Sequence, residues 1–313
     1  MINKSQLKDN SFSSVDHTPV FPLSLGGAGI GSCNENIFFQ EAISEKQAVE
    51  TILYALENGI NLIDTSPFYG NSEKKIGIAL QEYGNRSSLV ISTKAGTHPI
   101  YKGYSGENFR KSIENSLKLL QTDYLDIVHI HDPSTIEFKN MMENGGMETL
   151  LRLKEEKIIR NIGLGVRDHH IHFQFIASGY ADAILPYLDY NLLSTKAGPL
   201  LETAHKNNIS VLLGSALCMG ILSGKNPADI NIRHYDIEKD VSIEKAIQMY
   251  LWCCKNEVNL MALNYQFILN NPAVNTIIIG ASSKEEVEKS LHAYKENINP
   301  NLMKLFLQQF NLL

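Results

Sequence analysis

Four side chains that can hold or transfer a proton stand at or just after the ends of three successive apolar segments. Asp64 ends the first segment and Tyr69 follows it, Lys94 ends the second, and His131 ends the third. The carboxyl ends of neighbouring barrel strands meet at one face, so three such strands would bring these groups together. An ammonium at that face needs a counter-charge, and Asp64 is the nearest candidate. The set is therefore either a proton-transfer site or an ordinary ion pair beside a core imidazole and a loop tyrosine.

The three segments belong to a series of eight short apolar runs that spans the chain. Amphipathic stretches separate the runs, which predicts alternating strands and helices and a parallel sheet buried on both faces. Eight such units predict closure into a (β/α)8 TIM barrel, an α/β fold, with the active site at the C-terminal mouth of the strands. The expected strands lie at 20–27, 60–66, 89–94, 124–131, 158–166, 181–188, 209–216 and 274–281.

Several helices of the expected barrel have recognisable starts. Ser44 opens a capping box and Gly59 closes the helix that follows. Ser72 is expected to cap the next helix, and Ser105 or Gly106 to open the third. Further helices are expected near 146–157, 169–178, 196–207, 242–270 and 283–296.

No composition break or linker divides the chain, so we expect one domain over residues 1–313. Within it, residues 1–19 are expected to form an N-terminal extension and residues 217–241 a loop over the barrel mouth. A doubly wound sheet is the competing architecture. However, the glycines within 26–31 miss the G-x-G-x-x-G spacing, and the next helix begins too far on to hold a pyrophosphate. These glycines therefore indicate a permissive loop after the first strand.

Composition and charge exclude several functional classes. The 313 residues are 43% hydrophobic and 20% charged, which rules out a disordered chain. The net charge of −6 without a basic run offers no footprint for nucleic acid or an anionic membrane, so we expect a small-molecule partner. The four cysteines lack C-x-x-C spacing and the first residues lack an apolar signal segment, which predicts a cytoplasmic protein without a disulfide framework or zinc site. We expect a monomer or a small homo-oligomer.

Further histidines are weaker candidates for chemistry. His169, His170 and His172 suggest a metal site, but only Asp168 stands at ligand spacing, so we expect solvent-exposed helix side chains and no metal. His129 shares a strand face with His131 and is expected to line the core.

The aromatic residues of the loops are open to two interpretations. Phe38, Phe39 and Phe68 are placed to wall a substrate pocket, although loop aromatics commonly cover a core edge. For Tyr101 and Tyr104 we expect the second role.

Several sequence motifs are similar to those of a known enzyme family. They are DTSPFYGNSE at 64–73, STK at 92–94, DYLDIVHIHDP at 123–133, SAL at 215–217 and IGASS at 279–283. In this order, over about residues 20–296, the chain resembles the aldo-keto reductase superfamily. HIHDP and SALCMGILSG are most similar to the branch that contains the L-galactose dehydrogenases and aldose 1-dehydrogenases.

The resemblance implies the same (β/α)8 barrel and matches Asp64, Tyr69, Lys94 and His131 to the catalytic tetrad of the family. Tyr69 would exchange the proton of the substrate oxygen while a hydride moves between the substrate carbon and nicotinamide. An ammonium about 4 Å away at an effective dielectric near 20 stabilises a phenolate by roughly 4 kcal/mol, so Lys94 is expected to bring the pKa of Tyr69 from about 10 to about 7. Asp64 would hold Lys94, and His131 would donate to the substrate oxygen and orient it.

The resemblance also implies a dinucleotide held by the loops after the last two strands. Ser215 and Leu217 match positions that clamp the cofactor in the family. Gly280, Ser282 and Ser283 would hold a diphosphate or an adenosine ribose at the N-terminus of the final helix.

The identity of the dinucleotide is inferred from one position of that helix. Glu286 stands where NADP-dependent relatives carry a basic residue, so it would repel a 2'-phosphate and accept a hydrogen bond from a free 2'-hydroxyl. We therefore expect NAD in preference to NADP. Lys284 is the opposing feature, because it could supply a cation.

Three positions depart from the family pattern around the nicotinamide. Gly165 and Val166 replace the Ser-Asn pair that binds the carboxamide, and Gly214 replaces an aromatic that stacks on the ring. Tyr187 stands where a glutamine is common and is the candidate for a substitute contact.

The leading hypothesis is oxidation of C1 of a free aldose, of the L-galactose, L-fucose or D-arabinose type, to a lactone with Tyr69 as general base and NAD as hydride acceptor. An NADP-linked carbonyl reductase and a pyridoxal-type dehydrogenase are alternatives on the same barrel. A non-catalytic dinucleotide-sensing subunit and an aldolase that forms a Schiff base at Lys94 are alternatives of other classes.

Overall fold

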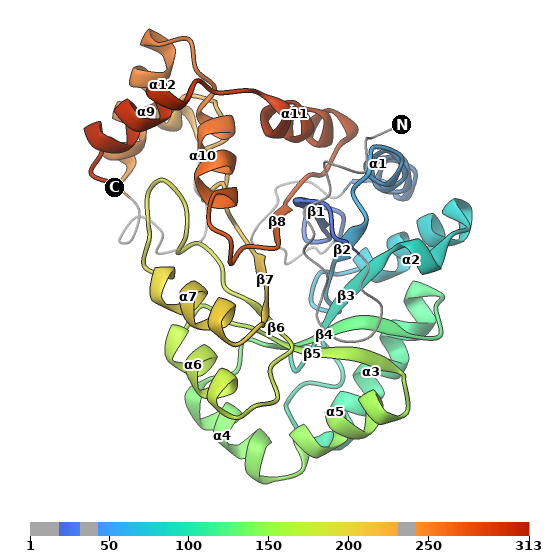
Figure 1. Cartoon of the computed structure of the whole chain (residues 1–313). Helices are drawn as coiled ribbons and strands as arrows, with labels where there is room; N and C mark the ends of the chain where they lie inside the picture. The colour runs from blue at the N-terminus through green and yellow to red at the C-terminus, as the bar shows by residue number, and fades with distance from the viewer. Residues whose placement is uncertain (1–18, 32–42, 231–241, 313) are drawn as a thin grey trace.

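Eight parallel strands close into a barrel in the computed structural model, which describes residues 19–31, 43–230 and 242–312. Hydrogen bonds join each strand to the next in chain order and join β8 back to β1 (Figure 1). Each strand coincides with one of the eight apolar runs, the third extending one residue beyond its run to Ala95, so the predicted (β/α)8 barrel is confirmed. The strands are β1 (Leu23–Gly26), β2 (Leu62–Asp64), β3 (Val90–Ala95), β4 (Leu125–His131), β5 (Ile159–Gly165), β6 (Ala183–Leu185), β7 (Ser210–Leu213) and β8 (Thr276–Ile279).

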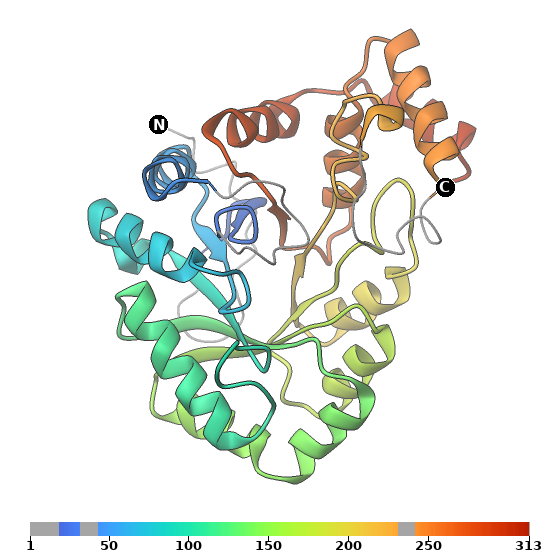
Figure 2. The same cartoon turned by 180° about the vertical axis from the view of Figure 1, so that it is seen from behind.

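Helices surround the strands, as the view from behind also shows (Figure 2). The helices are α1 (Glu45–Glu57), α2 (Ser72–Tyr83), α3 (Gly106–Leu120), α4 (Thr135–Glu143), α5 (Gly146–Glu155), α6 (His169–Ala177), α7 (Gly198–Lys206), α9 (Ile243–Lys255), α10 (Leu260–Leu269), α11 (Lys284–Lys295) and α12 (Pro300–Gln309), with short 3₁₀ helices η2 (Arg86–Ser88) and η3 (Pro227–Asp229). Helices α4 and α12 were not predicted from the sequence. The start of α4 was nevertheless readable, because Ser134 and Glu137 form a capping box.

The expected helix caps are confirmed in two cases and wrong in one. The hydroxyls of Ser44 and Ser105 accept hydrogen bonds from backbone N–H groups in the first turns of α1 and α3. Ser72 does not cap α2, because it is the first helical residue and Asn71 precedes it as the N-cap. The Ser72 hydroxyl instead lies 2.8 Å from Thr65 Oγ1, which ties the start of α2 to the end of β2.

Alternation along the strands divides the apolar side chains between the barrel interior and the layer beneath the helices. Ile127 lies in the interior, so His129 and His131 share the inward face of β4, as expected. The buried apolar cluster of the interior is small: Val20, Leu62, Val90, Ile127, Ala183, Leu185 and Leu212. Towards the mouth, buried polar side chains replace it: Asp64, Ser92, Lys94, His129 and His131. The mouth end of the barrel is therefore built for polar contacts.

The loop expected at 217–241 is described as far as residue 230 and contains η3. Its remainder, and nearly all of the extension expected at 1–19, lie outside the described residues. None of the helices in the described part of the chain is both long enough and apolar enough to cross a membrane. Of the four cysteines, the three in the described ranges, Cys218, Cys253 and Cys254, are free thiols.

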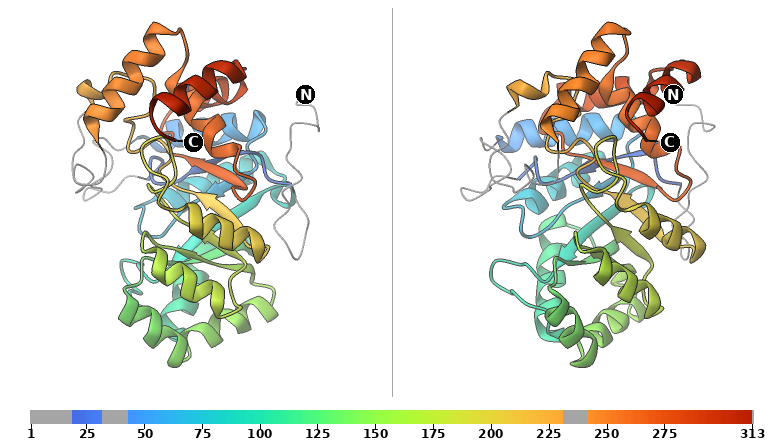
Figure 3. Two further views of the ribbon diagram at one scale, coloured as in Figure 1. Left: turned by 60° about the vertical axis from the view of Figure 1, so that its left-hand side comes forward. Right: turned by 90° about the vertical axis from the view of Figure 1, so that its left-hand side faces the viewer.

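The C-terminal helices α9 and α12 stand together beside the barrel (orange and red in Figure 3). Their contact is aromatic, because the ring centroids of Trp252 and Phe306 lie 5.1 Å apart. Phe310 extends this contact, with its centroid 4.8 Å from that of Phe306. This pair of helices adds an apolar contact outside the eight βα units.

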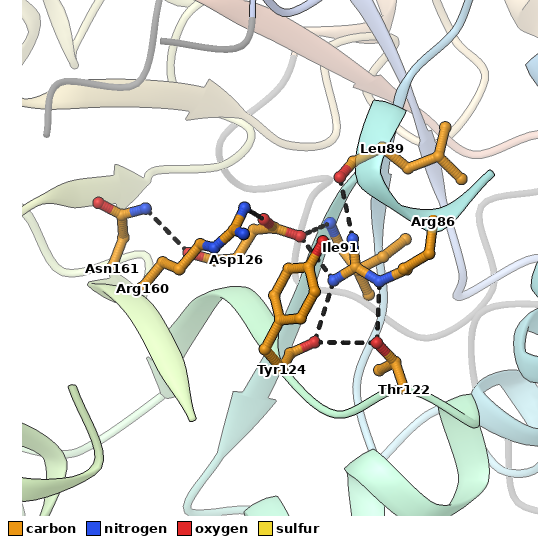
Figure 4. A network of polar contacts seen from close by, with 8 residues as sticks. All are labelled: Arg86, Leu89, Ile91, Thr122, Tyr124, Asp126, Arg160 and Asn161. Atoms are coloured by element: carbon orange, nitrogen blue, oxygen red, sulfur yellow. Dashed lines mark hydrogen bonds and ion pairs between the residues drawn. The ribbon is translucent and has the colours of Figure 1, made fainter. Parts of the chain in front are cut away.

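Asp126 is the centre of a polar network at the N-terminal ends of β3, β4 and β5 (Figure 4). Its carboxylate accepts hydrogen bonds from Arg86 Nη2 at 2.7 Å, Ile91 N at 2.8 Å and Arg160 Nη1 at 2.8 Å. The two guanidinium carbons lie 4.1 and 4.0 Å from the centroid of the Tyr124 ring. Because this end of a barrel serves stability and the opposite end serves function, we assign the DYLD motif a structural role.

Asp126→Ala should therefore lower the free energy of unfolding by about 3 kcal/mol, because it leaves two partly buried guanidinium groups without their shared carboxylate. Asp123→Ala is the matched control from the same motif, where the side chain is exposed, and should change stability by less than about 0.5 kcal/mol. Urea unfolding of the three proteins measures both effects. Equal stability of the two variants would contradict the structural role of the network.

Candidate active site

Asp64 and Lys94 form a buried ion pair at the barrel mouth. Lys94 Nζ lies 2.5 Å from Asp64 Oδ2 and donates a second hydrogen bond to the Thr65 carbonyl at 2.8 Å. The other carboxylate oxygen of Asp64 accepts from Ser92 Oγ at 2.8 Å. The side chains of the ion pair are only 2% and 5% exposed, so the two charges hold each other in place at the ends of β2 and β3.

Tyr69 lies beside this ion pair and beside His131. Lys94 Nζ is 4.8 Å from the centroid of the Tyr69 ring, and the ring packs edge-on against His131 with centroids 6.1 Å apart. The four residues singled out in the sequence are therefore brought together, although they come from the ends of three strands and a loop.

The expected pKa of Tyr69 near 7 is wrong for this geometry. Burial raises the pKa of the phenol above its ordinary value, and the negative charge of Asp64 raises it further. The positive charge of Lys94 lowers the pKa of Tyr69 but does not outweigh these two contributions. The charge of Lys94 alone would give the lower value, but the burial of the phenol opposes it. At neutral pH, Tyr69 therefore holds its proton and is disposed to donate it.

His131 is neutral and its ring is fixed by hydroxyl groups. Burial and the Lys94 charge hold the pKa of His131 well below its usual range. Thr97 Oγ1 is hydrogen-bonded to His131 Nδ1, and Ser66 Oγ lies 3.3 Å from the same atom. When either hydroxyl donates to Nδ1, the ring proton is on Nε2. That tautomer makes Nε2 a hydrogen-bond donor at the mouth.

The glycines after β1 make room for the loop that carries Tyr69. A Cβ at Gly31 would collide with the backbone carbonyl of Tyr69. A Cβ at Gly27 would lie 2.5 Å from Ser72 Oγ and 2.6 Å from Thr65 Oγ1. The glycines of the loop after β1 therefore allow the β2–α2 loop to pack closely against it, which agrees with the permissive loop expected from the sequence.

His129 lies deeper in the barrel than His131. It is fully buried, as expected for a core-lining residue, and neither ring nitrogen has a hydrogen-bond partner among the described residues. Gly163 lies against this ring, since a Cβ there would collide with Nδ1. Burial and the Lys94 charge hold the pKa of His129 well below its usual range, so the imidazole is neutral.

Two residues near His131 were not identified as candidates in the sequence. Tyr104 covers a core edge as expected, with its ring centroid 6.1 Å from that of buried Phe109, and its OH also donates to the His131 carbonyl at 2.7 Å. Asp132 Oδ2 lies 3.5 Å from His131 Nε2. The HIHDP motif contains Asp132 but gives no sign of the direction of its side chain.

Of the ten non-glycine residues with positive φ in the described part of the chain, five follow the ends of helices, where a left-handed residue is an ordinary helix stop, and five follow strands at the mouth. The five at the mouth follow β4, β6 and β7: Asp132 (45°), Leu188 (68°), Ser215 (52°), Cys218 (47°) and Met219 (56°). Such conformations cost on the order of 1–3 kcal/mol each and gather at active sites and ligand clamps. The strained positions therefore support a functional mouth.

The loop between β8 and α11 presents backbone and hydroxyl groups at the N-terminus of α11. Ser283 is the N-cap of α11 and its hydroxyl accepts from Glu286 N at 3.3 Å. A Cβ at Gly280 would meet no atom within 4 Å, so the backbone there faces open space. Glu286 Oε2 accepts from Ser282 N at 2.8 Å and from Ser282 Oγ at 2.9 Å. The Glu286 carboxylate thus lies over the helix N-terminus, where an anionic group would otherwise bind.

Lys284, the first residue of α11, is exposed. Its ammonium lies 4.7 Å from the centroid of the Tyr54 ring on α1. In the preceding loop, Ser215 and Leu217 follow β7 towards the mouth. The residues expected to hold a cofactor, apart from Tyr187, therefore occupy two neighbouring loops at one end of the barrel.

Tyr187 crosses the mouth from the loop after β6. Its hydroxyl donates to Asp132 Oδ1 at 3.1 Å. Gly214 leaves room for it, because a Cβ at that position would lie 3.0 Å from Tyr187 Cβ. Gly165 and Val166 carry no polar side chain, so no amide-binding group comes from these two positions.

The three histidines of α6 each contact a different partner. His169 Nε2 lies 3.3 Å from Asp189 Oδ2, and His170 Nε2 lies 3.0 Å from Gln174 Nε2. The expectation of solvent exposure is wrong for His172, which is fully buried with Nε2 2.8 Å from the Val166 carbonyl. Within the described ranges, no three His, Cys, Asp or Glu side chains are grouped to hold a metal ion.

Some of the aromatic candidates lie among the described residues and others do not. Phe68 is 49% exposed, and its ring centroid lies 6.2 Å from that of His131, so it borders the site. Tyr101 packs on His98 with centroids 4.6 Å apart. Phe38 and Phe39 lie outside the described residues.

Glu73, from the DTSPFYGNSE motif, is a buried carboxyl group next to the site. Thr93 Oγ1 donates to Glu73 Oε1 at 2.7 Å, while Oε2 has no hydrogen-bond partner among the described residues. Burial raises the pKa of Glu73 from 4.5 to about 7. A carboxyl whose pKa is higher in the folded state stabilises the fold fully below its unfolded pKa, and this contribution is lost as the pH rises through the folded pKa.

The free energy of unfolding should therefore fall between about pH 4.5 and pH 7 by up to roughly 3 kcal/mol from this group alone. Glu73→Gln should remove that component and be more stable than the wild type at pH 8. Glu82→Gln, an exposed position on the same helix, is the control and should keep the wild-type pH dependence. Urea unfolding across pH 5–8 measures the three curves, and an unchanged slope in Glu73→Gln would contradict the assignment.

Comparisons with known proteins identify the family and the fold. Residues 22–306 match the model of the aldo/keto reductase family. L-galactose dehydrogenase of Arabidopsis thaliana is 32% identical over 283 residues, which cover 88% of this chain and 86% of that protein. D-arabinose 1-dehydrogenase of Saccharomyces cerevisiae is 29% identical over 300 residues, covering 90% of this chain and 84% of that protein. The structure of a holo aldo-keto reductase from Bacillus halodurans shares the fold, with a TM-score of 0.77, 21% identity and coverage of 95% and 94%.

Proposed function

The chain belongs to the aldo/keto reductase family of NAD(P)-dependent oxidoreductases, and from that premise we propose that it oxidises C1 of a free aldose to a lactone with NAD. The observation that carries the proposal is the approach of Lys94 Nζ to 4.8 Å from the Tyr69 ring centroid, with Asp64 and His131 at the same point. The sugar class, L-galactose, L-fucose or D-arabinose type, is supported by two relatives named for sugar oxidation.

Each residue of the tetrad has a distinct task in this proposal. A bound nicotinamide supplies or accepts the hydride at the reacting carbon. Tyr69 exchanges the proton of the substrate oxygen, and Lys94 favours the deprotonated phenol. Asp64 holds Lys94 in place. His131 donates from Nε2 to the same oxygen and orients it.

Carbonyl reduction, including reduction linked to NADPH, is the second candidate, because one observation favours it. The raised pKa of Tyr69 keeps the proton on the phenol at neutral pH, and reduction requires that proton on the incoming oxygen. Oxidation requires the opposite ionisation state.

The rate of aldose oxidation should therefore rise with pH. Below the pKa of Tyr69, the deprotonated fraction increases tenfold for each pH unit, so kcat/KM for oxidation should rise with a slope near one from pH 7 to pH 9. The rate of aldehyde reduction should change little over the same range. Initial rates in both directions measure this, and a plateau of the oxidative rate near pH 7 would contradict the raised pKa.

We propose NAD over NADP on the position of Glu286. Its carboxylate accepts from Ser282 N and Ser282 Oγ at the start of α11, so a 2'-phosphate there would meet a negative charge. Glu286→Ala should bring the affinity for NADP at least about tenfold closer to that for NAD. Glu285→Ala, the exposed neighbouring acid, is the matched control and should leave the ratio unchanged.

The proposed function is tested by a panel of aldoses and aldehydes assayed with both dinucleotides, with the lactone identified by mass spectrometry. The expected result is lactone formation from at least one pyranose with NAD. Reduction of aldehydes without lactone formation would favour the carbonyl reductase. Dinucleotide binding without turnover on the whole panel would favour a sensing subunit, and borohydride trapping at Lys94 would favour the aldolase.

A further inference from the structure

The side chain of Asp132 lies at the barrel mouth, but it has no role in the proposed transfer of hydride or proton. It is 43% exposed, whereas the neighbouring His131 side chain is 8% exposed. Its two oxygens have different surroundings, because Oδ1 accepts from Tyr187 OH at 3.1 Å and Oδ2 lies 3.5 Å from His131 Nε2. A carboxylate has about four acceptor positions, so Oδ2 can take a further hydrogen bond.

The backbone at Asp132 is fixed by local contacts. Asp132 has φ of 45°, a left-handed conformation that aspartate tolerates better than most residues. Asp132 N donates to the Gly165 carbonyl at 2.8 Å, and Tyr104 OH donates to the His131 carbonyl at 2.7 Å. These two contacts hold the single peptide group between His131 and Asp132 from both of its sides, and Tyr187 holds the carboxylate itself. A solvated surface aspartate would need none of them.

The distance between His131 Nε2 and Asp132 Oδ2 matches two neighbouring substrate oxygens. His131 Nε2 is a hydrogen-bond donor, so it suits a substrate oxygen that accepts. That oxygen is the carbonyl oxygen in reduction, or the oxygen on C1 in oxidation of an aldose. Asp132 Oδ2 is an acceptor and suits a hydroxyl that donates. The two protein atoms lie 3.5 Å apart, so oxygens on adjacent carbons can each reach one of them.

We propose that Asp132 binds the hydroxyl group on the carbon next to the reacting carbon, and thereby selects α-hydroxy carbonyl compounds and aldoses over plain aldehydes. Tyr187 is the positioning residue that aims the carboxylate. The inference rests on the proposed function, because it takes the substrate oxygen to lie at Tyr69 and His131. It adds the chemical feature that the neighbouring carbon must carry.

The test compares reduction of 2-hydroxypropanal and propanal with NADH and, in parallel, with NADPH. The wild type should prefer the hydroxy aldehyde by about 10- to 100-fold in kcat/KM, the range for a hydrogen bond to a charged group. In Asp132→Gly, which suits the positive φ, this ratio should fall towards one. Asp132→Asn, which keeps an acceptor without charge, should give an intermediate ratio, and Tyr187→Phe a smaller decrease. The exposed Asp123→Asn is the control and should keep the wild-type ratio.

The readout is the ratio between two substrates, so a merely structural role of Asp132 would lower both rates and leave the ratio unchanged. That result, or a wild type that does not distinguish the two aldehydes or reduces neither, would overturn the proposal. The failure of the proposed function is a separate result. A wild type that prefers 2-hydroxypropanal but forms no lactone from any aldose would contradict aldose oxidation and leave the assignment of Asp132 intact.

Discussion

Tyr69→Phe should lower kcat by about a thousandfold in both directions, because proton transfer by a positioned side chain contributes roughly 10²–10⁴-fold. The substitution removes one hydroxyl and keeps the ring that packs against His131, so the fold should be retained. Steady-state rates with the best substrate of the panel, in oxidation and in reduction, measure the effect.

The matched control is Tyr180→Phe, because Tyr180 is an exposed tyrosine at the opposite end of the barrel, just before β6. It should keep the wild-type kcat, and both variants should unfold at the wild-type temperature. A Tyr69→Phe protein with normal turnover would remove the phenol from the mechanism.

Lys94→Met should cost both stability and activity. Removing one partner of a buried ion pair leaves Asp64 as an uncompensated buried charge, which lowers the free energy of unfolding by about 3–5 kcal/mol. The rate should fall as well, because the pKa of Tyr69 loses the one interaction with a neighbouring charge that lowers it. Urea unfolding and steady-state kinetics measure the two effects separately.

The double variant Asp64→Asn with Lys94→Met separates these effects. With both charges removed, stability should return to within about 1–2 kcal/mol of the wild type, while kcat should remain as low as in the single variant. Recovery of activity together with stability would mean that Lys94 acts only by supporting the fold.

The barrel and the tetrad were predictable from the sequence for the same physical reason. A parallel strand buried on both faces reads as a continuous apolar run, and a polar residue at the carboxyl end of such a run interrupts that pattern. Asp64, Lys94 and His131 each stood at such an end, and strand order in the barrel then determined that they are neighbours. Tyr69 was found by its motif, and the collision that a Cβ at Gly31 would cause shows how tightly its loop is placed.

Other features depend on contacts between distant segments and could not be predicted in this way. The hydrogen bond from Tyr187 to Asp132 joins residues 55 positions apart. The pKa of Tyr69 depends on the burial of the phenol, which no spacing reveals, so its direction was predicted wrongly. Ser72 looked like a cap in the sequence, but its hydroxyl is 2.8 Å from Thr65 Oγ1 instead.

The residues for proton transfer and the residues proposed for coenzyme binding lie in different parts of the chain, so substitutions can change one function without the other. The proton-transfer residues lie between Asp64 and His131, on β2 to β4, whereas the residues that we propose for the dinucleotide lie between Tyr187 and Glu286, after β6 to β8. On our proposal, a substitution at Glu286 would change the choice of coenzyme without touching the residues that handle the proton. Tyr187 is the exception, because its hydroxyl donates a hydrogen bond to Asp132, which follows β4. A substitution at Tyr187 could therefore affect both coenzyme binding and the site around His131.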